Sequence, residues 1–299
     1  MSRITPEWIA VDWGTTNLRV FAMRGPEVLA RAQSEEGMGR LNRDGFESAL
    51  HRLIEPWVNG GPVPIVACGM VGSRQGWIEA PYRAVPCKPL SEALTRAPSD
   101  LFGVHVISGL SQTQPADVMR GEETQIAGML ALNPSFDGVL CLPGTHTKWA
   151  HLSANEVVSF RTFMTGELFA LLTDYSVLRH SVSSDAWEAD SFAEGVATTL
   201  SRPEALAANL FNLRAAGLLH GTLAAQLRAR LSGLLLGAEL AAARPYWLGQ
   251  NLAILGLGAQ AKAYRDALAS QGVSAVQVDS ERATLAGLTA AYSHLKETA

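Results

Sequence analysis

The sequence has no excess of positive charge and no long hydrophobic run. Its 24 lysine and arginine residues are outnumbered by 28 aspartate and glutamate residues, which leaves a formal net charge of −4. A basic surface of the kind that binds nucleic acid is therefore not expected. The longest apolar stretch, near residues 234–243, is short and contains Glu239. No segment is therefore predicted to cross a bilayer.

Cysteine is also scarce. The three cysteines, Cys68, Cys87 and Cys141, have apolar surroundings, are odd in number and lack the spacing of metal ligands. This pattern predicts reduced thiols packed in a core rather than disulfides or a zinc site. Because a strand pattern begins directly after the first few residues, no signal peptide is expected. The prediction is a cytoplasmic protein, with a homodimer as an open alternative to a monomer.

The sequence does contain a high share of hydrophobic residues, 47% of its 299. Such a chain can bury a sizeable core, and its length favours about two domains. Periodicity predicts two α/β blocks, residues 1–134 and 135–299, which meet at the turn of Asn133, Pro134 and Ser135. Strands are expected at residues 8–11, 18–23, 28–32, 63–68, 82–85, 104–107, 138–142, 156–163, 252–256 and 275–278. Helices are expected at residues 44–58, 122–132, 260–270 and 281–296, and within residues 191–243.

One turn occurs twice in the sequence. Residues 10–20 read AVDWGTTNLRV and residues 140–150 read LCLPGTHTKWA. Each copy is an apolar strand followed by Gly-Thr, a polar pair and a basic residue. We name residues 14–19 glycine turn 1 and residues 144–148 glycine turn 2. The repeat predicts a duplicated domain with a cleft between the copies.

The chemistry of both turns suits phosphate. Glycine lets the backbone approach a ligand, and successive N–H groups in a tight turn form an anion-binding concavity. Threonine hydroxyls and basic side chains add donors. The residues expected to bind a nucleotide here are Gly14, Thr15, Thr16, Asn17, Arg19, Gly144, Thr145, His146, Thr147 and Lys148.

The two copies differ at the end of the preceding strand. Asp12 stands there in the first copy, whereas the second copy has Leu142. Magnesium bound between phosphates needs only one carboxylate, often through water, because Mg²⁺ keeps much of its hydration shell. The pair of turns therefore predicts a split ATP site in which Asp12 is the metal residue.

A third glycine motif follows near the C-terminus. An apolar strand ends in Gly256-Leu257-Gly258 and leads into a helix. Backbone at a helix N-terminus of this kind can pack against a nucleoside. Because this motif follows two phosphate turns in the sequence, Gly256 and Gly258 are expected to bind adenosine.

These three motifs resemble those of the actin/hexokinase/Hsp70 ATPase superfamily. More narrowly, the whole chain resembles the 2-dehydro-3-deoxygalactonokinase family, in CGMVGSRQGW (68–77), DVMRGEETQ (117–125), LPGTHTKW (142–149) and FRTFMTGELF (160–169). The resemblance implies an α/β protein of two ribonuclease-H-like domains flanking an interdomain cleft. It also implies an ATP-dependent kinase that phosphorylates the C6 hydroxyl of a small sugar acid, 2-dehydro-3-deoxy-D-galactonate, in galactonate catabolism.

Two adjacent carboxylates are candidates for the catalytic base. Glu122 and Glu123 follow Gly121 at the start of a predicted helix, where the helix dipole favours the ionised form. Neighbouring helix positions diverge by about 100°, so both cannot face the same site equally. Periodicity leaves the choice open. A similar element in exopolyphosphatase-like relatives favours the second glutamate, Glu123.

The substrate is expected to meet the loop at residues 69–77. Arg74 could bind a carboxylate with two hydrogen bonds, and Ser73, Gln75 and Trp77 could contact hydroxyls and the carbon chain. Further expected substrate residues are Gly37, Met38 and Arg161.

Two other functions remain open at this point. An exopolyphosphatase-type phosphohydrolase would share the glycine turns and a catalytic glutamate, but would need a more basic channel. A non-catalytic ATP-binding sugar sensor would share the fold, because this superfamily hosts filaments, chaperones and kinases.

Overall fold

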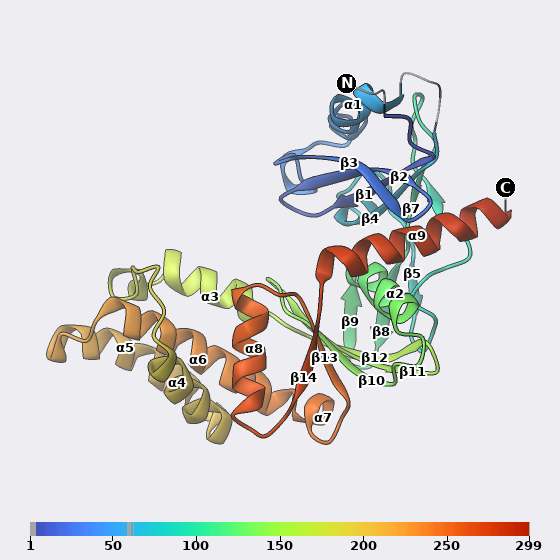
Figure 1. Ribbon diagram of the computed structural model, residues 1–299. Coiled ribbons are helices and arrows are strands. Elements are labelled where there is room, and N and C mark those ends of the chain that lie inside the picture. Colours follow the sequence, from blue (N-terminus) through green and yellow to red (C-terminus); the bar gives the residue numbers. More distant parts are fainter. Residues whose placement is uncertain (1–3, 59–60, 62, 299) are drawn as a thin grey trace. The chain divides into compact units, whose positions relative to one another are not determined.

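The computed structural model describes residues 4–58, 61 and 63–298, which form two compact units (Figure 1). Unit 1 comprises the described residues within Met1–Asp137, Leu152–Ser159 and Asp279–Ala299. Unit 2 comprises Gly138–His151 and Phe160–Val278. The final helix therefore groups with the first unit, so the units are not two continuous halves. The domain boundary after residue 134 stays a prediction.

Unit 1 is built on a six-stranded sheet of order β3-β2-β1-β4-β7-β6. Strand β1 pairs antiparallel with β2 and parallel with β4, and β4 pairs parallel with β7. Because β1 and β4 are parallel, their carboxyl ends lie at the same edge of the sheet. The strands are β1 (Trp8–Trp13), β2 (Leu18–Arg24), β3 (Glu27–Ser34), β4 (Ile65–Gly69), β6 (Thr95–Arg96) and β7 (Val104–Val106).

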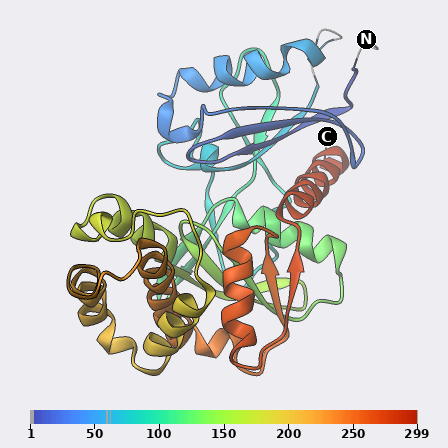
Figure 2. The ribbon, with the colours of Figure 1, turned by 60° about the vertical axis from the view of Figure 1, so that its left-hand side comes forward.

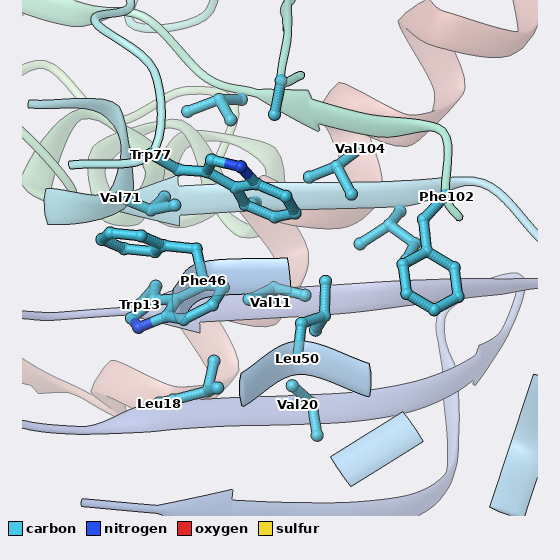
Figure 3. Close-up of a cluster of buried hydrophobic side chains, with 14 of the residues drawn as sticks. Val11, Trp13, Leu18, Val20, Phe46, Leu50, Val71, Trp77, Phe102 and Val104 are labelled. Atoms are coloured by element: carbon cyan, nitrogen blue, oxygen red, sulfur yellow. The ribbon is translucent and has the colours of Figure 1, made fainter. Parts of the chain in front are cut away.

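One face of this sheet is covered by helix α1 (Gly45–Val58), whose apolar side faces the strands. Figure 3 shows the resulting core, in which Trp13, Phe46 and Trp77 pack together. The rings of Phe46 and Trp77 stack with centroids 6.1 Å apart. Large aromatic side chains bury much apolar surface, so this cluster stabilises the sheet directly below glycine turn 1.

The other face of the sheet meets α9 (Ser280–Thr298), which in turn packs on α2 (Glu122–Leu132) (Figure 1). Two glycines permit the close helix contact. A Cβ on Gly128 would lie 1.8 Å from the carbonyl oxygen of Ala283, and one on Gly287 would lie 1.9 Å from that of Thr124. A smaller sheet of β5 (Tyr82–Ala84), β8 (Gly109–Thr113) and β9 (Ala116–Met119) leads into α2.

Unit 2 repeats the strand order of unit 1. Its sheet runs β12-β11-β10-β13-β14, which matches the order β3-β2-β1-β4-β7 in the other sheet, where the short edge strand β6 precedes β7 in the chain. Strands β10, β13 and β14 are parallel to one another. The repeat in sequence is therefore a repeat in fold. The strands are β10 (Gly138–Leu142), β11 (Thr147–Ser153), β12 (Glu156–Phe163), β13 (Leu252–Leu255) and β14 (Ala275–Val278).

Most of unit 2 outside the sheet is helical. Helix α8 stands beside β13 and β14 in both views (Figures 1 and 2). Helices α4 and α6 pack closely because Gly195 and Gly233 face each other, with a Cβ on either lying 3.0 Å from the Cα of the other. The helices are α3 (Thr165–Asp174), α4 (Ala189–Ser201), α5 (Leu206–His220), α6 (Ala224–Ala242), α7 (Arg244–Trp247) and α8 (Ala259–Ala269). Short 3₁₀ turns complete the chain at Met38–Arg40, Met70–Gly72, Val177–His180 and Pro203–Ala205.

Most of the expected strands and helices are present, with ends shifted by a few residues. The sequence analysis missed the hairpin of β8 and β9, because its strands are short, contain polar residues and surround Pro115. Within the described ranges, no helix combines the length and the apolar character that a membrane span requires.

Candidate active site

Glycine turn 1 connects β1 to β2 and is held by a neighbouring loop. The Gly14 N–H donates to the Asn17 carbonyl at 2.9 Å, which closes the turn, and the backbone N–H groups of residues 37–39 donate to carbonyls of residues 14–16. A Cβ on Gly37 would lie 2.2 Å from the Thr16 carbonyl carbon. Gly37 and Met38 therefore support the turn, and the side chains of Thr15, Thr16 and Asn17 remain exposed.

Asp12 lies at the end of β1, beside this turn. Its carboxylate forms an ion pair with Arg19, and its side chain is only 16% exposed. Burial raises the pKa of Asp12, and the Arg19 guanidinium opposes that rise. No group of three or more His, Cys, Asp or Glu side chains suited to a metal ion occurs among the described residues. A single carboxylate fits Mg²⁺ that takes its other ligands from phosphate and water.

The two candidate bases begin helix α2 but differ in their surroundings. The Glu123 side chain is fully buried, and its carboxylate accepts hydrogen bonds from the Gly121 N–H at 2.7 Å and the Thr124 hydroxyl at 3.0 Å. Glu122 is half-buried and accepts from the Arg120 N–H at 3.0 Å. Burial, with the charge of Glu122 as a second cause, raises the pKa of Glu123 to about 7.

Asp12 and Glu123 are brought together around Cys68. In the parallel register of β1 and β4, Asp12 pairs with Cys68, and a Cβ on Gly121 would lie 3.3 Å from the Cα of Gly69. Burial raises the pKa of the Cys68 thiol, and the charges of Asp12 and Glu123 raise it further. Asp12 thus lies at the carboxyl end of β1, and Glu123, at the start of α2, lies near the carboxyl end of the parallel neighbour β4, at an edge where α/β proteins commonly bind ligands.

The predicted substrate loop follows β4 at the same edge. Arg74 and Gln75 are exposed, and Arg74 Nε lies 3.4 Å from the Glu79 carboxylate. Ser73 is buried, and its hydroxyl has no hydrogen-bond partner. Trp77 is 3% exposed and packs in the core (Figure 3), so it supports the loop from below and offers no open ring face.

Glycine turn 2 rests on a buried hydrogen-bond network. Glu239 on α6 accepts hydrogen bonds from Trp149 Nε1 at 2.8 Å, from the Tyr264 hydroxyl at 2.8 Å, and from the Thr165 hydroxyl. The Thr147 hydroxyl lies 2.7 Å from that of Tyr264. Because Tyr264 donates its proton to Glu239, Thr147 donates to Tyr264. The network therefore links α3, α6 and α8 to the turn.

The other residues of glycine turn 2 divide into exposed and buried groups. Thr145 and His146 are exposed, and His146 Nε2 lies 2.6 Å from the Glu167 carboxylate. Lys148 is 6% exposed, and its ammonium donates to the Thr162 hydroxyl at 2.8 Å. Arg161 is exposed on β12. Thr147 and Lys148 are thus held inside unit 2, which leaves the backbone of Gly144 and the side chains of Thr145 and His146 outward.

A pocket of about 690 Å³ lies beside this turn in unit 2. The lining comes from glycine turn 2 and from helices α3, α6 and α8, and Arg228 stands over the Phe169 ring at 5.0 Å. The sequence pattern did not indicate several residues of this wall, because those on the helices have the spacing of ordinary amphipathic helices and Trp187 lies in the loop before α4. The wall residues that it missed are Phe169, Trp187, Arg228, Ser232, Gln260, Lys262 and Tyr264.

The glycines of the three motifs differ in whether the protein's own structure requires glycine at that position. Gly256 has a φ of +111°, which favours glycine whatever the ligand. Gly14, Gly144 and Gly258 do not lie in the left-handed region, and a Cβ on any of them would meet no protein atom closer than 3.7 Å. Neither the backbone nor the packing of the chain requires glycine at these three positions. The open space fits a ligand that approaches the backbone closely.

The chain is similar to proteins with a single named activity. It matches the family described as 2-keto-3-deoxy-galactonokinase over residues 12–291. It is 41% identical over 299 residues to "Probable 2-dehydro-3-deoxygalactonokinase DgoK1" of Rhizobium meliloti, covering 95% of this chain and 96% of the relative. It is 37% identical over 290 residues to the 2-dehydro-3-deoxygalactonokinase of Escherichia coli, covering 95% and 97%.

Solved structures agree with this assignment. A crystal structure of a Sinorhizobium meliloti protein described as a 2-dehydro-3-deoxygalactonokinase superposes with a TM-score of 0.91 at 38% identity, covering 96% of this chain and 99% of the other. Component A of an Acidaminococcus fermentans (R)-2-hydroxyglutaryl-CoA dehydratase shares the fold alone, with a TM-score of 0.52 at 14% identity, covering 97% and 98%. The chain shares its α/β fold with these solved structures, and it belongs to the 2-keto-3-deoxy-galactonokinase family.

Proposed function

We propose that this protein transfers the γ-phosphoryl group of ATP to the C6 hydroxyl of 2-dehydro-3-deoxy-D-galactonate, in galactonate catabolism. The observation that carries the proposal is its similarity over nearly its whole length to proteins named for this activity. The juxtaposition of Asp12 with Glu123 in unit 1 gives that similarity a chemical basis. A cytoplasmic location is a further prediction, and a homodimer stays open as an alternative to a monomer.

Asp12 is the residue that would hold Mg²⁺. When bound, the ion would neutralise charge on the phosphates and help to orient them. Arg19 forms an ion pair with the partly buried carboxylate of Asp12 and holds it in place. The role of Arg19 is therefore to position the metal residue, in addition to its predicted contact with phosphate. The neutral strand end at Leu142 avoids a second negative charge near a polyanion.

Glu123 is the proposed base for the acceptor hydroxyl. A pKa of about 7 lets its carboxylate accept a proton near neutral pH and release it again. The Gly121 N–H and the Thr124 hydroxyl hold the carboxylate in one orientation. Glu122, which is more accessible, is the alternative base.

Unit 2 would hold the nucleotide. The adenosine would occupy the pocket walled by α3, α6 and α8, where Phe169 and Arg228 offer an aromatic face and a cation. The backbone of Gly144 and the side chains of Thr145 and His146 would donate to phosphate oxygens. The exposed Arg74 would attract the sugar acid.

The decisive experiment is a coupled assay of ADP release across aldonates and 2-dehydro-3-deoxy acids. We expect turnover to depend on one acid, 2-dehydro-3-deoxy-D-galactonate, and the phosphate to appear on its C6 oxygen by NMR. ATP hydrolysis that proceeds equally without any acceptor would contradict the proposal and favour a phosphohydrolase. Tight ATP binding with no turnover in the presence of every acid would favour a sensor.

A further inference from the structure

We propose that Arg120 and Ser73 form the subsite that binds the carboxylate of the sugar acid. The inference rests on the proposed function, and it assigns this role to a buried arginine in place of the exposed Arg74. It starts from two polar side chains in unit 1 that the fold buries without satisfying them.

The Arg120 guanidinium is a buried charge without an acidic partner. Arg120 is 8% exposed, and its Nη2 donates to the Ala80 carbonyl at 2.7 Å, whereas its Nε and Nη1 have no hydrogen-bond partner. None of the ion pairs in the described part of the chain includes it. Arginine carries its charge at every physiological pH. A buried charge of this kind is costly unless something pairs with it.

The fold nevertheless holds this side chain firmly in one place. Its guanidinium lies over the ring of Tyr82, 4.3 Å from the centroid. A Cβ on Gly72 would lie 2.9 Å from Nη1, so the guanidinium faces the backbone of the loop that follows β4. The Nε and Nη1 N–H groups point to different sides of this desolvated guanidinium, so a bound carboxylate would accept from one of them together with the second N–H of Nη2.

Ser73 lies next to Gly72 in the same loop and supplies a second unsatisfied donor. It is 4% exposed, and its hydroxyl has no hydrogen-bond partner. Buried hydroxyls and guanidinium N–H groups are nearly always hydrogen-bonded in folded proteins. Two such groups on adjoining segments therefore point to one missing acceptor. A carboxylate offers several lone pairs and can accept from both.

The position of the pair suits the reaction. Arg120 directly precedes Gly121 and the candidate bases Glu122 and Glu123, and Ser73 follows β4 at the strand edge that carries Asp12. The free N–H groups are shielded from solvent, so under this proposal the loop at Gly72 and Ser73 has to move away from Arg120 when the acid binds. Arg74, by contrast, has a side chain that is 80% exposed. Ion pairs at such exposed positions contribute little binding free energy.

The sharpest test is Ser73→Ala, because it separates a binding role from a structural one. Removing an unsatisfied buried hydroxyl should leave the melting temperature unchanged or higher. If the hydroxyl binds the acid, KM for the acid rises about 5-fold to 10-fold while KM for ATP stays within about twofold. Ser111→Ala, in strand β8 of the same unit, is the matched control and should change neither KM. An unchanged KM for the acid in Ser73→Ala would contradict the role of Ser73.

Arg120→Lys tests the guanidinium, since lysine retains the charge but loses the paired donors. We expect KM for the acid to rise about 30-fold or more, with KM for ATP nearly unchanged. Arg83→Lys is the control, because Arg83 also donates to backbone carbonyls, those of Lys88 and Pro89. The wild-type preference for the acid over its methyl ester should shrink in Arg120→Lys and persist in Arg83→Lys.

The outcomes separate this inference from the proposed function. A wild-type protein without acid-dependent turnover would overturn the function itself. Acid-dependent turnover in which Arg120→Lys keeps its preference for the acid over the ester would overturn only the subsite. Should Arg120→Lys fail to fold, the Ser73→Ala result and the matching Arg74→Ala variant decide the matter: a larger rise of the acid KM in Arg74→Ala than in Ser73→Ala would contradict the inference.

Discussion

Glycine turn 1 and glycine turn 2 each follow the first strand of a sheet with the same strand order, and they use carboxylates differently. In unit 1, Asp12 lies at the strand end itself and pairs with Arg19. In unit 2, the strand ends at Leu142, the Glu167 carboxylate lies 2.6 Å from His146 Nε2 in the turn, and Glu239 on α6 belongs to the buried network. Glu239 reaches the turn through Tyr264 and Thr147.

The difference shows two uses of a carboxylate near a phosphate-binding backbone. At turn 1 the carboxylate retains some exposure and can act on a cation. At turn 2 the carboxylate is saturated by three donors, and burial raises its pKa, so it acts by holding other side chains. The two copies of the turn thus share a backbone but differ in the charge at the end of the preceding strand.

The largest expected effect comes from removing the Asp12 carboxylate, which lies beside glycine turn 1. Asp12→Asn should lower kcat by about 10³-fold or more, because the only carboxylate at this strand end is lost. The melting temperature should not fall, since burial penalises the ionised carboxylate that the substitution removes. Steady-state kinetics across Mg²⁺ concentrations and thermal melts measure both. Asp44→Asn, an exposed charge change at the start of α1, is the control, and near-normal turnover of Asp12→Asn would refute the metal role.

The next effect tests the base beside turn 1. Glu123→Gln should lower kcat by about 10²-fold to 10⁴-fold, with a smaller loss in Glu122→Gln. In the wild type, kcat should rise as pH increases through about 7, because the base must be ionised. The pH profile of both variants checks the assignment. The reverse ranking of the two variants would identify Glu122 as the base.

The same substitution has a stability signature of known sign. The folded pKa of Glu123 is raised from 4.5 to about 7, so its contribution to stability is fully present below pH 4.5 and is lost as pH rises through 7. Glu123→Gln cannot lose this contribution. Its melting temperature relative to wild type should therefore increase between pH 4.5 and pH 8, and a flat difference across that range would contradict the raised pKa.

A moderate effect is expected from filling the space at the motif glycines. Gly144→Ala should raise KM for ATP about tenfold without lowering the melting temperature, because the new Cβ meets no protein atom within 3.9 Å. Gly14→Ala tests the same point in turn 1. Gly166→Ala is the contrasting control, since its Cβ would lie 2.3 Å from the Gly144 carbonyl oxygen and should destabilise the fold. Unchanged ATP affinity in Gly144→Ala would show that nothing approaches this turn closely.

The smallest effect should come from the network under turn 2. Glu239→Gln keeps the shape but turns one acceptor oxygen into a donor, so we expect KM for ATP to rise several-fold with kcat little changed. Tyr264→Phe should add little to Glu239→Gln if both act through Thr147. Glu194→Gln, which removes an exposed ion pair with Arg230 on the neighbouring helix, is the control. Equal increases in the KM values for ATP and for the sugar acid would argue against a positioning role specific to the nucleotide.

The sequence by itself determined the features that depend on local pattern. Alternation and helical periodicity located most strands and helices, the repeated Gly-Thr turns predicted the duplicated fold, and Asp12 against Leu142 predicted the asymmetry between the copies. These features can be predicted from the sequence because neighbouring residues determine where backbone turns form and where strands end.

Tertiary structure alone decided how deeply each polar side chain is buried and what it meets. It buried Glu123 and left Glu122 half-buried, placed Trp77 in the core, and brought Glu239 into contact with Trp149, which directly follows glycine turn 2 and is 90 residues away in the chain. It also left Arg120 without an acidic partner. Burial and hydrogen bonding arise from contacts between segments remote in sequence, so no local spacing could have predicted them.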